Sequence, residues 1–396
     1  MGLWKRLLIN ARAWALCGLA VRHALTLGLH VRNEAKELSD IAKEQRVRLW
    51  WSLYSMECSL NELTGRPTCI SDQDISTPLP VNADVDEMRP GQSLYDHDHD
   101  RKKRYSSHGM FSTTLWHIYL LIAFEDNSAA DFTMPMGTVR PLVYAYPILE
   151  LPITSSTYFI YQTQLTIISH EIVSHLYCAA TIKVKWHDVQ STIKRIDQHL
   201  LRWRDSLPNE FNINFDDWPE PDWNNEFTVL RIGLALHYHS SRMILFRPCL
   251  CRFDKDSRFG GQSAESQAFN QSAVVNCIES AHRTISMLKG AARSMERLFL
   301  IAPWWQTIHF LCEAMSILVL EMGYRAQHMR KDAKDILDDA KKGVNWLAKM
   351  AGRSISARKA WEIYDILVKA TAPMIGWSVF DMASEAPCPP EYKASI

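Results

Sequence analysis

The sequence predicts an all-α, multi-helical protein with no significant sheet, and three observations lead to this fold class. Apolar residues recur at helical spacing in one stretch after another, most clearly at Leu49, Leu53, Met56, Leu60 and Leu63, whose separations are 4, 3, 4 and 3. No stretch shows the sustained alternation that a half-buried strand requires. Apolar residues make up 47% of the 396 positions and charged residues 22%, which is typical of a globular protein with a large core.

Two helices are predicted in the first 65 residues. An apolar helix over residues 11–27 ends at Gly28, and Ser39 precedes the start of the second, wider helix. Trp50 lies beside the apolar stripe of this second helix. We therefore expect Trp50 and Leu53 to be buried.

The second helix is predicted to end at Gly65 and to lead into a non-helical strap. Glycine adopts the left-handed conformation of a helix C-cap without steric cost, and Pro67 prevents the helix from resuming. The strap that follows carries Asp72, Asp74 and the Pro-Leu-Pro sequence at 78–80. We expect it to be fixed in place and hydrogen-bonded.

Further along the chain, helical patterns alternate with loops. Residues 83–110 contain Pro-Gly and dense runs of charge, which is typical of a flexible linker, and the proline-rich end of the chain at 383–396 is expected to be disordered. Four prolines between 128 and 157 forbid a continuous helix there. Helices are predicted at 111–125, 158–180, 184–206, 227–246, 266–291, 303–329, 333–350 and 357–370.

The charge balance and the cysteines limit what this chain does by itself. Lys+Arg and Asp+Glu each total 44, so the chain lacks the basic excess that a DNA-binding protein usually carries. Its nine cysteines are scattered and include no Cys-x-x-Cys, which argues against a zinc cluster or a disulfide framework. We expect no cofactor in this chain. No apolar run is long enough to span a membrane.

A long ordered string of uncommon residues resembles one known family, the fungal-specific transcription factor regulatory domain. This is the middle homology region of fungal binuclear zinc-cluster regulators, of the xylanolytic activator type. The string continues upstream to Trp14. Downstream of it, the chain resembles the family in its helical pattern, including the segment that begins at Pro303. Its residues at the second helix and the strap are Trp50, Trp51, Tyr54, Gly65, Arg66, Pro67, Asp72, Asp74, Pro78 and Pro80.

The resemblance implies a regulator of RNA polymerase II transcription in a fungal nucleus. In that family DNA is read by a separate six-cysteine zinc cluster, so DNA and zinc are expected only through an element that this chain lacks. The resemblance further implies homo- or heterodimers with related transcription factors and a small-molecule effector. The four basic residues Arg101, Lys102, Lys103 and Arg104 fit a nuclear-import signal.

The resemblance also sets the expected domain boundaries. Residues 1–82 correspond to the C-terminal part of the regulatory core, 83–110 to a linker, 111–382 to the remaining helical bundle and 383–396 to the tail. Further helices precede the signature in the family. Three interpretations follow, namely a truncated gene model, a natural short form, and a co-regulator or dominant-negative partner without its own DNA binding.

Two groups of polar and aromatic residues have alternative interpretations. Arg242, Trp305 and His309 are predicted to line a ligand pocket between helices, with a filled core as the competing interpretation. Arg66 is expected to cap the preceding helix or to pair with Asp72 or Asp74, with a contact to a ligand or partner as the competing interpretation.

The sequence contains no catalytic constellation, so we predict that the chain is not an enzyme. His170 and His175 are five residues apart and diverge by about 140° on a helix, so they are expected to be polar positions rather than zinc ligands. Aspartate pairs near 216 and 338 resemble those of all-α terpenoid enzymes, the alternative interpretation. The first falls in a proline-rich loop, and the second is interspersed with lysines on a solvated face.

Overall fold

The computed structural model describes residues 2–83, 153–213, 227–252, 263–291 and 304–382, together with 225, 298 and 385. Within these residues the regular structure consists of α-helices and short 3₁₀ turns, without a strand, which confirms the all-α prediction. None of the described helices is both long and apolar enough to cross a membrane. The linker prediction beyond Ala83, the basic run at 101–104, the helix at 111–125, nearly all of 128–157 and nearly all of the tail lie outside the described residues.

The chain forms two compact units. Unit 1 comprises residues 1–173 and 205–208, and unit 2 comprises 174–204 and 209–396. The boundaries predicted from the family resemblance stay a prediction.

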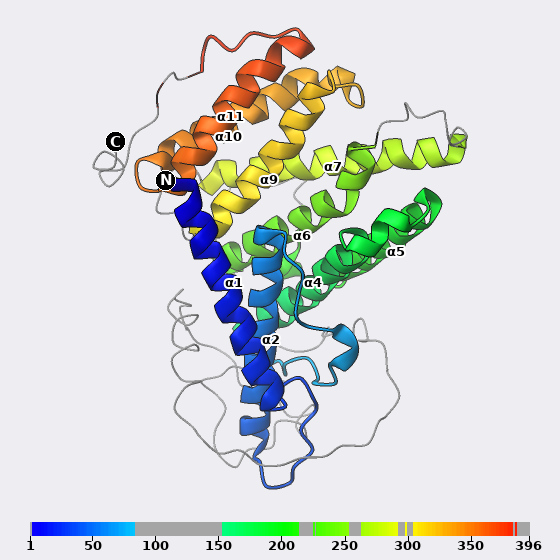
Figure 1. Cartoon of the computed structure of the whole chain (residues 1–396), viewed down its shortest axis with the longest axis vertical. Helices are drawn as coiled ribbons and strands as arrows, with labels where there is room; N and C mark the ends of the chain where they lie inside the picture. The colour runs from blue at the N-terminus through cyan, green and yellow to red at the C-terminus, as the bar shows by residue number, and fades with distance from the viewer. Residues whose placement is uncertain are drawn as a thin grey trace. The chain divides into compact units, whose positions relative to one another are not determined.

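Unit 1 is built around one central helix. Helix α1 (Gly2–Thr26) and helix α2 (Asp40–Thr64) lie side by side (Figure 1). Residues of α4 (Ser155–Leu176) pack against the same core. Trp50 is fully buried and Leu53 is 9% exposed, as predicted.

Helix α2 buries a wider surface than its leucine stripe suggested. Leu49, Met56 and Leu60 are only partly buried, whereas Trp51 and Tyr54 are inaccessible to solvent. The reason is that α1, the strap and α4 all pack around α2, so more than one of its faces is covered.

The predicted ends of α2 are confirmed. The Ser39 side chain accepts a hydrogen bond from the Ala42 amide and caps the N-terminus. Gly65 has φ 64° and ψ 25°, the left-handed conformation of a C-cap, and its amide donates to the Asn61 carbonyl. The chain therefore leaves α2 in one defined direction.

Unit 2 is a helical bundle in which neighbours along the chain also pack in space (Figure 1). Helix α6 packs on α7, α7 on α9, and α10 on α11. The bounds are α5 Trp186–Asp205, α6 Phe227–Leu250, α7 Ala264–Ala291, α9 Trp304–Gly323, α10 Ala333–Ala351 and α11 Ile355–Thr371.

Three predicted helix ends in unit 2 are wrong, and the first is that of α4, which ends at Leu176 rather than at residue 180. Helix α6 continues past Pro248 to Leu250. Pro248 has no N–H to donate to the Ile244 carbonyl four residues earlier. The Tyr177 hydroxyl donates to that carbonyl instead, at 2.6 Å. Helix α9 ends at Gly323 rather than near residue 329. The buried Glu321 carboxylate accepts the His328 amide at 2.9 Å and so holds the chain in a turn.

Candidate functional site

The family signature builds one continuous contact between α2 and the strap, which we define as residues 66–83. Side chains at successive turns of α2 bind successive strap residues in reverse order. Trp51 Nε1 donates to the Pro78 carbonyl at 2.7 Å, and the Tyr54 hydroxyl donates to Asp72 Oδ1 at 2.9 Å. The strap therefore runs antiparallel to the helix and is held at several points along it.

A buried ion pair fixes the far end of the strap. Arg48 Nε donates to Glu44 Oε1 at 2.8 Å, and Arg48 Nη2 donates to the carbonyls of Val81 and Ala83 at 3.0 and 2.7 Å. The Val81 amide returns a hydrogen bond to Glu44 Oε1 at 3.0 Å. Burial raises the pKa of Glu44, while Arg48 opposes that shift. Removing either partner would leave a buried charge uncompensated.

The near end of the strap is held by another acidic residue of α2. Glu57 Oε1 accepts hydrogen bonds from the Cys69 amide at 3.1 Å and from the Asn61 side chain at 3.4 Å. Asn61 in turn accepts from Trp14 Nε1 at 3.0 Å, which connects α1 to the same network.

The expectation for Arg66 is wrong in detail. Its guanidinium lies 4.9 Å from the centre of the Trp14 ring. Among the described residues it forms no ion pair with Asp72 or Asp74 and no hydrogen bond that caps α2. Arg66 nevertheless has a structural contact, because a cation over an indole face is stabilising.

His170 joins the middle of the strap. Its Nδ1 lies 2.8 Å from the Tyr54 hydroxyl and 3.0 Å from Asp72 Oδ2, and its side chain is nearly inaccessible. His175 is exposed, so the two histidines do not meet. Tyr54, Asp72 and His170 instead form one hydrogen-bonded triad that joins α2, the strap and α4.

The remaining signature residues divide by exposure. Pro80 is buried, whereas Pro67, Asp74 and the ring of Pro78 lie at the surface. The signature therefore acts through the hydrogen-bonding groups of α2 and the path of the strap.

The three residues predicted to line a ligand pocket lie in unit 2, Arg242 on α6 and Trp305 and His309 on α9. Arg242 Nε lies 3.8 Å from Asp197 of α5, and its guanidinium covers the rings of Tyr238 and Phe246. Trp305 is 40% exposed, so the core interpretation is wrong for that ring. Their role in ligand binding stays a prediction.

A partly buried hydrogen bond joins a serine of α6 to a glutamate of α9. Ser240 Oγ donates to Glu313 Oε2 at 2.5 Å. Burial raises the pKa of Glu313 to about 7 and lowers the pKa of His237 and His309 to about 4. Near pH 7 the two histidines are thus neutral, and Glu313 is close to half protonated.

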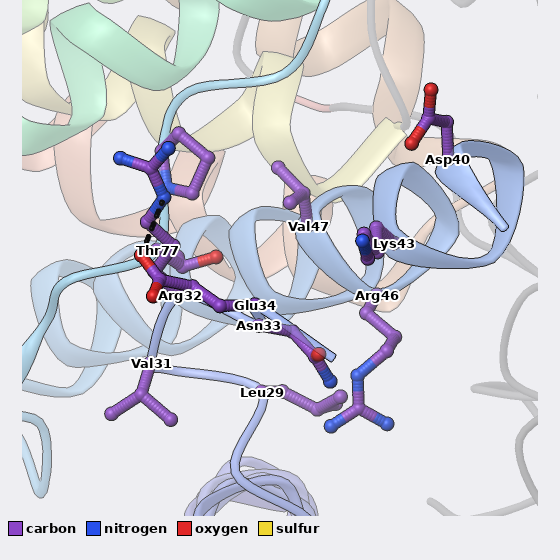
Figure 2. Close-up of a pocket in the computed structure, with 11 residues that line it drawn as sticks. Leu29, Val31, Arg32, Asn33, Glu34, Asp40, Lys43, Arg46, Val47 and Thr77 are labelled. Carbon is purple, nitrogen blue, oxygen red and sulfur yellow. Dashed lines mark ion pairs between the residues drawn. The ribbon is translucent and has the colours of Figure 1, made fainter. Parts of the chain in front are cut away.

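A hollow of about 380 Å³ lies in unit 1, beside the strap (Figure 2). Its walls come from Leu29 and residues 31–34, from the first turns of α2 and from Thr77 and Pro78. No pattern in the sequence indicates this hollow.

Several residues of the strap network were also missed. Glu44 precedes Arg48 by four positions, a helical pairing that the sequence does display. His170 gives no such signal, because it lies 98 positions from Asp72 and only the folded chain brings the two together.

Comparison with known proteins places the chain among fungal regulators. A family model described as "Fungal specific transcription factor domain" matches residues 1–205. "Transcription regulator galc" of Aspergillus niger is 25% identical over 410 residues, which cover 96% of this chain and 46% of that protein. "Activator of stress genes protein 1" of Candida albicans is 21% identical over 321 residues, covering 77% of this chain and 27% of the relative. No solved structure matches.

The chain spans about half or less of the length of these curated relatives. The family match nevertheless extends over more than half of the 396 residues and includes α1, α2, the strap and α4. The family resemblance is confirmed: this chain belongs to the fungal specific transcription factor domain family.

Proposed function

We propose that this chain is the regulatory region of a fungal transcription regulator, that it acts in the nucleus and that it performs no catalysis. The observation that carries the proposal is the contact between α2 and the strap. The signature side chains Trp51 and Tyr54, together with Arg48 of the same helix, bind the strap of the same chain. Such residues support a scaffold that changes state or binds partners, and the relatives bear the names of transcription regulators.

In this proposal the chain does not read DNA itself. DNA is contacted through the zinc cluster that the family uses, and the chain adjusts the outcome through its own partners or effector. The balanced charge of the chain supports this division of labour, because non-specific DNA binding depends on an excess of Lys and Arg.

A reporter assay tests the regulatory role directly. The full chain is fused to an unrelated DNA-binding module in a fungal host, and transcription from the matching reporter is compared with that of the module alone. We expect activation or repression by the fused chain. Arg48→Met, which removes the strap contacts to Val81 and Ala83, should abolish that effect at equal protein level. Reporter output equal to that of the module alone would refute the regulatory role.

Nuclear import is tested by microscopy of a fluorescently tagged full chain. Replacing Arg101, Lys102, Lys103 and Arg104 together by alanine should reduce nuclear accumulation. The matched control is Arg330→Ala with Lys331→Ala, which removes two exposed basic residues elsewhere. If both variants accumulate in the nucleus like the parent, the basic run at 101–104 is not an import signal.

A further inference from the structure

The hollow beside the strap has the size of a small-molecule site, and it is open to solvent on the side of Arg32 and Glu34. Its volume of about 380 Å³ falls at the lower end of the range of roughly 300–1,000 Å³ that ligand pockets occupy. It lies entirely within unit 1, between the segment that connects α1 to α2, the start of α2, and the strap. Its occupant must therefore be small.

Two cations of α2, Lys43 and Arg46, line this hollow, and neither forms an ion pair with a carboxylate in the part of the chain that the structure describes. Lys43 and Arg46 are three residues apart, so they lie on the same side of the helix, and Figure 2 draws both from that side. Lys43 forms no ion pair with any described residue. Arg46 Nη2 donates to the Leu27 carbonyl at 2.5 Å, and burial lowers the pKa of its guanidinium.

The acidic residues of the walls balance only part of the positive charge of the lining. Glu34 pairs with Arg32 at 3.6 Å, as the dashed line in Figure 2 marks. Asp40 is the other carboxylate; it lies three residues before Lys43 on the same side of α2, and these two described side chains form no ion pair with each other. The lining thus carries three cations against two carboxylates, and a partly desolvated arginine without an acid favours an anionic guest.

The remaining lining is mixed, with the apolar Leu29, Val31, Val47 and Pro78 beside the polar Asn33 and Thr77. A ligand that suits this lining has one anionic group for the α2 cations and a short hydrocarbon body for the apolar residues. We infer that the hollow binds a small organic carboxylate, with Lys43 and Arg46 holding its carboxyl group.

Such a ligand would contact the strap at the place where the signature holds it. The amides of Ser76 and Thr77 donate to the His30 carbonyl at 2.9 and 3.0 Å, and Trp51 holds the Pro78 carbonyl. Binding would therefore stabilise both walls in one arrangement. The further idea that this is the effector site rests on the proposed regulatory function, whereas binding itself does not.

Calorimetric titration and thermal unfolding of the full chain test the inference, with hexanoate as the probe and hexanamide as its uncharged match. Hexanoate should bind saturably and raise Tm, and hexanamide should do neither. Lys43→Gln should weaken hexanoate binding about tenfold, the usual effect of losing one charge-assisted contact. Lys36→Gln, which removes the same charge from an exposed site outside the hollow, should bind like the parent.

Several results would overturn the inference. These are the absence of saturable hexanoate binding, equal binding of hexanamide, or equal weakening by Lys43→Gln and Lys36→Gln. Circular dichroism of each variant establishes that it is folded. If hexanoate binds as expected but leaves the reporter fusion unchanged, the anion site stands and its effector role is refuted; the reporter assay without hexanoate tests the regulatory function separately.

Discussion

The triad of Tyr54, Asp72 and His170 gives the sharpest test of how the signature holds the strap. Tyr54→Phe removes one hydroxyl and keeps the ring. That hydroxyl contacts Asp72 at 2.9 Å and His170 at 2.8 Å, and the Tyr54 ring is inaccessible. A hydrogen bond to a charged group contributes about 1.5–3 kcal/mol. The Asp72 side chain is 32% exposed and still bonds His170, so we expect a loss of about 1–2 kcal/mol.

The assay is urea unfolding of the full chain, followed by circular dichroism and tryptophan fluorescence. A double-mutant cycle with Asp72→Ala isolates the pairwise contribution, because the double variant loses the shared contact only once. We expect a coupling free energy of at least about 0.5 kcal/mol between the two substitutions. The m-value, which is the dependence of the unfolding free energy on urea concentration, should stay unchanged.

Two results would refute the reasoning about the triad. One is a loss of less than about 0.3 kcal/mol for Tyr54→Phe, which would be within the usual effect of a surface substitution. The other is additivity of Tyr54→Phe and Asp72→Ala, which would mean that the two residues act independently and that the triad does not hold the strap.

Three further predictions address the core, the pH dependence and DNA binding. Leu53→Ala should cost about 2–3 kcal/mol in urea unfolding, whereas Leu16→Ala at a 65% exposed site should change stability by less than about 0.5 kcal/mol. The folded pKa of Glu313, about 7, exceeds its ordinary 4.5, so its favourable contribution is present at low pH and is lost as the pH rises through 7. Glu313→Gln should therefore gain stability relative to the parent by up to about 1.4 kcal/mol per pH unit between about pH 5 and 7 in parallel unfolding curves. In fluorescence anisotropy the full chain should bind DNA weakly, with strong salt dependence and no preference for a promoter over its scrambled sequence; a tight, discriminating complex would contradict this.

The sequence by itself determined the features that depend on near neighbours. The all-α class follows from the spacing of apolar residues, and the two ends of α2 follow from Ser39 and Gly65, whose effects act within one helical turn. The burial of Trp50 and Leu53 is also readable, because both lie on or beside a helical apolar stripe.

Only the tertiary structure decided which polar groups meet. The strap returns along α2 in the reverse direction, so Arg48 reaches Val81 and Trp51 reaches Pro78 across 33 and 27 positions. The hollow likewise joins wall residues from three separate stretches of the chain. Local spacing carries no signal for such partners, because hydrogen bonds and ion pairs depend on distances of about 3 Å that are set by how the whole chain packs.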